Sequence, residues 1–220
     1  MELLEGIKTR RSVRGFKRTP IPDDVMDEIL RAVANSPSHS NTQPWEIAVV
    51  YGQKKEELCK IITNLARAKA PAAPDLPTPA SWPAEMEGRS REHGERRLNM
   101  LGIARDDQDG REHLRLMNFE FFGAPCAILL FTDRSLGEWS IFDMGLCAQS
   151  LILAAHALGL GTVLQASVTS YADAIRQFLD IPSSKRLVIC VSIGYPDESA
   201  KLNEYRALKQ RPEDFTKWYR

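Results

Sequence analysis

The sequence predicts an α+β fold, with a mostly antiparallel central sheet wrapped by helices. Segments with strand and helix character mix without the strict alternation of a doubly wound fold. Short apolar runs that do not alternate, such as Ala127–Thr132, predict strands buried on both faces. The segment Phe142–Leu158 is apolar nearly all round, which is typical of a helix at the centre of a fold. The 220 residues suit a single domain spanning 1–220.

The first third of the chain is expected to alternate between helices and one strand. A proline followed by two acidic residues at 22–24 is typical of a helix N-terminus. Four consecutive apolar residues at 47–50 predict a strand that is buried on both sides. In order, we expect a short helix ending near Arg10, a helix ending before Asn35, a polar loop Ser38–Pro44, a strand Trp45–Tyr51 and a helix Lys54–Ala68.

The stretch Pro71–Gly110 is interpreted as an excursion from the core. Five prolines in thirteen residues, 71–83, exclude regular helix and central strand there. From Glu85 to about His113 the chain is charged, with helical propensity and few apolar anchors. Two interpretations stay open: a solvated, partly mobile lid, or a cover over a ligand site. The side chains that could select an aromatic or anionic ligand are Trp82, Arg89, Arg91, His93, Arg96 and Arg97.

The second half is expected to supply the remaining strands. Gly159 and Gly161 should stop the long apolar helix, and Thr169 or Ser170 should cap a short helix. The elements predicted here are a helix Glu112–Phe122, strands Ala127–Thr132, Thr162–Ala166 and Leu187–Ile193, the helix Phe142–Leu158 and a short helix Tyr171–Leu179.

Composition argues against several classes of protein. Lys plus Arg and Asp plus Glu both number 29, and this balance argues against a general nucleic-acid surface. The N-terminus is charged and no apolar run reaches about 18 residues, so we expect a cytoplasmic protein without membrane contact. The four cysteines form no C-x-x-C pair and are expected to be buried free thiols. No histidine has metal-ligand spacing, so no metal site is predicted.

Two segments carry chemistry. Arg10, Arg11, Ser12 and Arg14 lie within five residues, and guanidinium groups with a hydroxyl suit phosphate oxygens. The alternative is a solvated basic turn. The loop Ser36–Trp45 concentrates hydroxyl and amide side chains before a strand, and these can hydrogen-bond the polar edge of a ring. The alternative there is an Asx-rich turn. His39 in this loop has no partner at a known catalytic spacing, and no glycine-rich nucleotide loop occurs.

These segments resemble the nitroreductase family of flavoproteins. The pattern Arg10-Arg11-Ser12-Val13-Arg14-x-Phe16 is followed, at similar spacing, by Ser36-Pro37-Ser38-x-x-Asn41-x-Gln43-Pro44-Trp45. Asp143-Met144-Gly145 resembles the start of the family's central dimer helix, and the glycine turns at 158–162 and 194–196 resemble two of its turns. The resemblance covers nearly the whole chain. The excursion resembles a longer nitroreductase-like subgroup.

The resemblance implies a domain-swapped homodimer with flavin mononucleotide (FMN) at its interface. The family usually has arginine where this chain has Lys209, which keeps the charge but loses the bidentate fork. The implied roles follow. Arg10, Arg11, Ser12 and Arg14 hold the FMN phosphate and ribityl chain, and Arg206 and Lys209 reach the phosphate. Pro37, Ser38, His39, Ser40 and Asn41 of the other subunit line the isoalloxazine, with Gln43 behind them. Gln165, Ala166 and Ser167 bring backbone N–H groups near flavin N5.

The resemblance also implies a reaction. Hydride would pass from NADH or NADPH through FMN to an electron acceptor such as a nitroaromatic or a quinone, in a two-step, ping-pong exchange. No side chain is expected to act as an acid or base. Three alternatives remain: a specialised reductase or reductive dehalogenase on the same scaffold, a non-enzymatic FMN carrier or sensor, and a structural dimer without cofactor.

Overall fold

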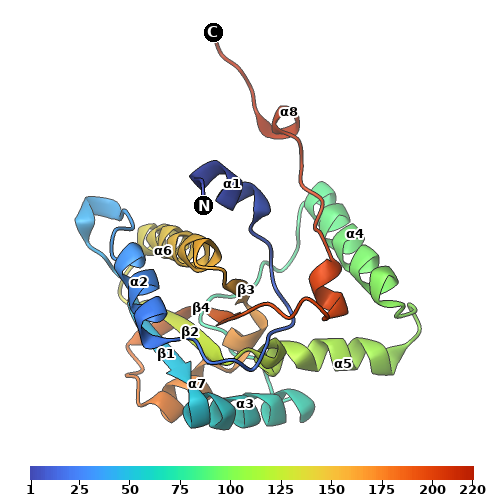
Figure 1. Ribbon diagram of the computed structural model, residues 1–220, viewed down its shortest axis with the longest axis horizontal. Helices are drawn as coiled ribbons and strands as arrows, with labels where there is room; N and C mark the ends of the chain where they lie inside the picture. The colour runs from blue at the N-terminus through green and yellow to red at the C-terminus, as the bar shows by residue number, and fades with distance from the viewer.

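The computed structural model describes residues Met1–Arg220, and a four-stranded sheet lies at its centre (Figure 1). The strand order is β1-β2-β4-β3, and each neighbouring pair is antiparallel. The prediction of an α+β fold with an antiparallel sheet is confirmed. The strands are β1 (Glu46–Tyr51), β2 (Cys126–Asp133), β3 (Gly161–Gln165) and β4 (Lys185–Gly194).

Two helical layers cover the sheet, as the alternation along β2 dictates. Cys126, Ile128 and Leu130 pack with one layer, while the residues between them pack with the other. Figure 1 shows these layers above and below the strands. The first layer holds α2 (Asp23–Val33) and α6 (Glu138–Ala157), and the second holds α3 (Gly52–Arg67), α5 (Gln108–Phe119) and α7 (Ala172–Leu179).

Several predicted boundaries are wrong, for local reasons. Helix α6 begins at Glu138 rather than at the predicted Phe142. The prediction missed its first turn because polar residues interrupt the apolar pattern there. Helix α5 begins at Gln108 rather than at the predicted Glu112. At this start, the Asp107 carboxylate caps the helix by accepting a hydrogen bond from Gly110 N. The capping prediction for α7 is also wrong. No side chain caps that helix, and the Thr169 hydroxyl donates to Ala166 O instead.

Strand β1 is not buried on both sides. It lies at the edge of the sheet, and most of its residues are exposed or half-buried. Tyr51, at its end, is 63% exposed. An apolar run fits an edge strand as well as a central one, so the sequence could not separate the two.

The excursion consists of a proline-rich segment and helix α4 (Ala84–Leu101), which ends at Gly102 with φ +74°. The proline-rich segment has no regular structure, but it is tied to the core. The Asp75 side chain is 5% exposed, pairs with Arg176 and Arg134, and accepts a hydrogen bond from Leu187 N. On α4, Leu98 and Leu101 pack against the larger core cluster, although no residue of that helix is fully buried.

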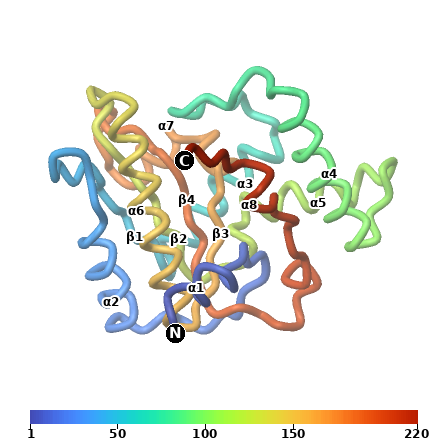
Figure 2. The backbone as a smooth tube through the Cα atoms, turned by 90° about the horizontal axis from the view of Figure 1, so that it is seen from above, coloured from blue at the N-terminus to red at the C-terminus, as the bar shows by residue number.

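Both ends of the chain lie on the α6 side of the sheet (Figure 2). Helix α1 (Leu3–Thr9) is bonded to the end of α6 through Thr9 Oγ1 and His156 Nε2, 2.8 Å apart. The tail beyond residue 205 leaves the body of the molecule (Figure 1). The remaining short helices are η1 (His39–Asn41), η2 (Phe121–Gly123), η3 (Ser167–Tyr171), η4 (Lys201–Glu204) and α8 (Pro212–Phe215).

Helix α6 is long and apolar enough, by length and composition, to cross a membrane. Core helices meet the same test, and eight of its residues are buried inside the molecule. Packing against the sheet and α2 explains the apolar residues on its buried face.

Candidate functional site

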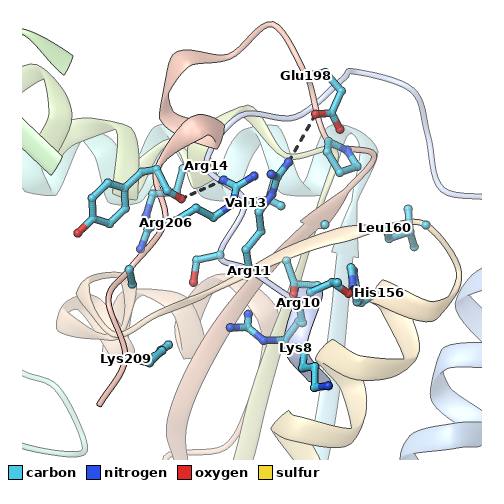
Figure 3. A pocket seen from close by; sticks show the side chains of 18 of the residues that line it. Lys8, Arg10, Arg11, Val13, Arg14, His156, Leu160, Glu198, Arg206 and Lys209 are labelled. Carbon is cyan, nitrogen blue, oxygen red and sulfur yellow. Dashed lines mark hydrogen bonds and ion pairs between the residues drawn. The ribbon is translucent and has the colours of Figure 1, made fainter. Parts of the chain in front are cut away.

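A basic cavity of about 660 Å³ opens where the two ends of the chain meet (Figure 3). The N-terminal segment 8–14 forms one wall, and residues 205–209 form the facing wall. The turn after α6 closes a third side with His156 and Leu160. Its polar lining includes Lys8, Arg10, Arg11, Ser12, Arg14, His93, His156, Glu198, Arg206 and Lys209.

Pairing with the sheet holds the N-terminal segment in an extended form. Val13 N donates to Thr162 O at 2.9 Å, and Ser12 forms a parallel bridge with the same residue. The Val13 side chain is buried and packs on Gly161, where a Cβ atom would come within 2.6 Å of it. Because side chains alternate along an extended chain, the buried Val13 leaves Ser12 and Arg14 to line the cavity.

Asn203 joins the two walls. Its Oδ1 accepts from Arg14 N at 2.7 Å, and its Nδ2 donates to Gly15 O at 2.7 Å. The residue is 4% exposed, so both hydrogen bonds are shielded from water. Sequence reasoning missed Asn203, because a single asparagine in a polar tail carries no recognisable signal.

The cavity holds an excess of positive charge, and Glu198 is the one carboxylate in its lining. Burial, followed by the nearby Arg97 charge, lowers the pKa of Arg14 to about 10. Burial also lowers the pKa of Arg10. Neither residue forms an ion pair, and Arg11 reaches only the exposed Glu198 at 3.5 Å. Removing cations from water without a partner costs free energy, even when they are only half-buried, and an anion such as a phosphate would neutralise them.

The tail contributes two further cations. Arg206 donates from Nη1 to Asn203 O at 2.7 Å and to Tyr205 O at 3.1 Å, so part of its guanidinium is used by the backbone. Lys209 lines the cavity and forms no ion pair. The structure thus brings Arg10, Arg11, Ser12, Arg14, Arg206 and Lys209 together, as the sequence predicted.

The polar loop is exposed and strained. Ser40, Asn41 and Gln43 all have positive φ angles, in the left-handed region that non-glycine residues seldom adopt. Two contacts stabilise it: Ser38 Oγ accepts from Gln43 N at 3.0 Å, and His39 N donates to the Asp143 carboxylate at 3.0 and 3.1 Å. Backbone strain of this kind concentrates at ligand-binding sites.

Asp143 is the second residue whose role sequence reasoning missed. It is 2% exposed and lies in the first half of α6, where it holds the loop from below. The His39 ring packs beside Trp139, with ring centroids 5.4 Å apart. The buried Asp143 therefore fixes the backbone of the exposed loop to helix α6.

Within one chain the structure does not bring the loop and the basic cavity together. The loop is anchored at Asp143, and the cavity is bordered by His156, thirteen residues later on α6. At about 1.5 Å per residue, that spacing is roughly 20 Å along the helix. Pro37, Ser38, His39, Ser40, Asn41 and Gln43 are all absent from the cavity lining.

The Gln165 side chain is occupied within the core. The residue is 2% exposed, and its side chain donates to Asn118 O at 2.6 Å and accepts from the Ser192 hydroxyl. A ligand can therefore reach this segment only through its backbone or through Ala166 and Ser167, which are exposed. Their placement near a flavin stays a prediction.

The cysteines offer no nucleophile. Cys126, Cys147 and Cys190 are buried free thiols, as predicted, and Cys59 is half-buried. Burial raises the pKa of Cys126 to about 12 and that of Cys147 to about 11. These thiols stay protonated near neutral pH and act as small apolar side chains.

Comparison with known proteins agrees with this geometry. The chain is 34% identical to 4-nitrobenzoate reductase of Pseudomonas putida, over 96% of this chain and 92% of that protein. It is 32% identical to nitroreductase NfnB of Mycolicibacterium smegmatis, over 97% of this chain and 91% of that protein. Its fold matches the crystal structure of the FMN-dependent nitroreductase NfnB from Mycobacterium smegmatis in complex with NADPH, with a TM-score of 0.94, 30% identity and full coverage of both chains. Residues 7–195 match the Nitroreductase family, so the chain belongs to that family.

Proposed function

We propose that the protein is an FMN-dependent oxidoreductase that passes a hydride from NADH or NADPH to a nitroaromatic acceptor or a quinone. The observation that carries the proposal is the basic cavity, where the half-buried Arg10 and Arg14 lack carboxylate partners and suit the phosphate of a flavin nucleotide. Full-length similarity to nitroaromatic reductases supports the same acceptor class. FMN, when bound, supplies the hydride chemistry, and the chain supplies position and electrostatics.

The residues of the cavity have different roles in binding the phosphate. Arg10 and Arg14 hold the phosphate by charge, Ser12 adds a neutral donor, and Lys209 closes the other side. The loop offers amide and hydroxyl groups, chiefly from Ser40 and Asn41, to a polar ring edge. We assign no acid or base to the chain, and protons come from water or substrate.

We further propose that the active form is a homodimer, formed along α6. Trp139 and Phe142 are 67% and 59% exposed, and with Gly145 and Gln149 they form an exposed stripe on that helix. The tail presents Phe215, Trp218 and Tyr219, each at least two-thirds exposed. Such concentrations of exposed aromatic surface are typical of protein interfaces.

A twofold axis near the middle of α6 would complete the site. The midpoint between Asp143 and His156 lies at 149–150. Antiparallel packing of two copies about this point brings the loop of one chain near the basic cavity of the other. Each FMN would then lie between a phosphate half from one subunit and a ring half from its partner.

The excursion at about 71–110 is proposed as a cover over the same site within a single domain. Its anchoring through Asp75 and the packing of α4 near the cavity support that role. The cytoplasmic location stays a prediction.

The test is whether the purified protein binds FMN and turns over. We expect a yellow preparation with the absorbance of FMN. We also expect NADH or NADPH oxidation that accelerates when 4-nitrobenzoate or a quinone is added. Bound FMN without turnover by either nicotinamide would favour the carrier or sensor. Failure to bind FMN at all would leave only a structural dimer.

A further inference from the structure

The excursion contributes a histidine to the basic cavity. His93 lies on α4, is half-buried and lines the cavity opposite the N-terminal arginines. The other lining residues come from the N-terminal segment, from residues 156–162 around the end of α6 and the start of β3, and from residues 196–209 after β4. Through His93 the excursion is therefore part of the cavity wall.

Tyr205 fixes the orientation of the His93 ring. The hydroxyl donates to His93 O at 3.1 Å, and its oxygen lies 3.0 Å from His93 Nδ1. A phenol has one proton, so in the arrangement where the carbonyl receives it, Nδ1–H donates to the phenol oxygen. In a neutral ring, Nε2 then has a lone pair and no proton.

Four positive side chains lie close enough to His93 to affect its ionisation. Burial lowers the pKa of His93, and the charges of Arg97, Arg14, Lys209 and Arg96 lower it further. The acidic residues nearest on α4, Glu92 and Glu95, are exposed. The charged and titratable groups facing the ring are Arg96 and Arg97 from α4, Arg14 from the N-terminal segment, and Tyr205 and Lys209 from the tail.

Arg97 adds to the positive charge around His93, and no carboxylate offsets the charge of its own guanidinium. Its Nε is buried and has no hydrogen-bond partner, and the residue forms no ion pair. Burial lowers the pKa of Arg97 as well. A bound dianion would offset part of this positive field and would favour a second proton on His93.

We propose that His93 is an additional phosphate-binding residue, supplied by the excursion, which takes up a proton when a phosphorylated flavin enters the cavity. The proposal rests on the proposed FMN function. The bound imidazolium keeps its Nδ1–H bond to Tyr205 and offers Nε2–H to the phosphate. The excursion then recognises the phosphate end of the cofactor in addition to covering the site.

The proposal fixes the sign of the pH dependence. Binding raises the pKa of His93, so affinity for FMN is highest below the pKa of the free protein and falls as pH rises through that of the complex. The second ionisation of the phosphate, near pH 6, acts in the opposite direction. Measurements above about pH 7 therefore isolate the histidine.

Calorimetric titration of the flavin-stripped protein tests this inference. FMN and riboflavin are titrated at about pH 7.5 in phosphate-free buffers with different ionisation enthalpies, which gives the number of protons taken up. We expect net uptake with FMN and none with riboflavin. His93→Gln should abolish the uptake and weaken FMN binding about tenfold, while binding of riboflavin stays unchanged.

Two further variants sharpen the result. His113→Gln removes an exposed histidine of α5 and should retain full proton uptake. His93→Asn keeps a donor on the Tyr205 side and should lose uptake like His93→Gln. FMN binding without uptake in the wild type, or equal uptake in His93→Gln, would overturn the proposal while leaving the FMN function intact. Absence of FMN binding would overturn both.

Discussion

Arg14 shows how one residue can serve both the fold and the site. Its backbone N–H is bonded to Asn203, which fixes the register of the two ends of the chain. Its guanidinium lies in the cavity, where burial and a neighbouring cation lower its pKa to about 10. The cost of burying this charge is offset only if a ligand supplies the missing negative charge.

Replacing Arg14 by alanine should therefore weaken FMN far more than riboflavin. Loss of one charge-assisted contact costs about 1.5–3 kcal/mol, which corresponds to roughly a 10- to 100-fold rise in Kd. Flavin fluorescence titration measures this directly. Arg18→Ala, at an exposed position outside the cavity, is the matched control and should leave Kd unchanged. An unchanged Kd in Arg14→Ala would contradict the assigned role.

At this scale the sequence predicted part of the site. The residues at 10–14 and 38–43 were recognisable because functional side chains cluster within a few positions. Asn203 and the phosphate-facing role of His93 were not recognisable, because each residue contributes alone, from a segment brought in by the fold. Arg206 and Lys209 came only from the family resemblance.

Among the elements, the proline-rich segment depends most on one side chain. Asp75 binds Arg176, Arg134 and a backbone N–H of β4, far from its own position in the chain. Burial raises the pKa of Asp75, but the hydrogen bonds from Arg176 and Leu187 outweigh this effect, and the net pKa is lowered. The segment is thus held to α7 by a buried ion pair and to β4 by a hydrogen bond.

Asp75→Asn should destabilise the protein by about 3–5 kcal/mol near neutral pH, because it leaves the Arg176 charge in the core without this partner. Since the pKa is depressed on folding, the stabilisation is present above the ordinary aspartate value of 3.8 and is lost as pH falls below it. Denaturant unfolding at pH 7 and pH 3 should show the difference shrinking in acid. Asp173→Asn removes the exposed partner of Arg176 and should cost at most about 1 kcal/mol.

The contact between β3 and the N-terminal segment leads to a second prediction. A methyl group at Gly161 would lie 2.6–2.9 Å from three atoms of Val13, so Gly161→Ala must push Ser12 and Arg14 outward. We expect a loss of about 1–3 kcal/mol in stability and weaker FMN binding.

Thermal unfolding and flavin titration measure the two effects of Gly161→Ala. Gly88→Ala, in open space on α4, is the control and should stabilise the helix by up to about 1 kcal/mol. Normal FMN affinity in Gly161→Ala would show that the segment tolerates displacement.

The types of the helices and strands were easier to predict than their exposure and their end residues. Apolar runs indicated all four strands, yet the exposure of β1 depends on its place in the sheet, which periodicity does not encode. The start of α6 was missed because its first turn carries polar residues and an exposed tryptophan instead of an apolar pattern.

For the whole molecule, the central question is whether one chain or two build each flavin site. Residue patterns indicated a phosphate-binding turn and a polar loop. The expectation that the two form halves of one flavin site, from different subunits, came from the family resemblance and stays a prediction. The distance between the two halves, nearly four turns of α6, now gives it a physical basis.

Mixed dimers can decide between the two arrangements. Arg14→Ala impairs the phosphate half and Asn41→Leu impairs the ring half, so each homodimer should be inactive. If each site uses both chains, co-expression restores one intact site in every heterodimer, and random pairing should give about a quarter of wild-type activity. If each site lies within one chain, the mixture stays inactive. Activity of separately purified, unmixed variants is the baseline.

The hydrogen bonds of Asn203 also determine when, during synthesis of the chain, the cavity can bind its cofactor. They join positions 189 residues apart, and residues 205–209 form the second wall of the cavity. Until residues 203–209 have left the ribosome, the N-terminal arginines face water with no opposite wall. Loading of a phosphorylated cofactor must therefore follow the emergence of these residues. Proteolytic trimming before Asn203 would cause loss of the cofactor while leaving the sheet in place.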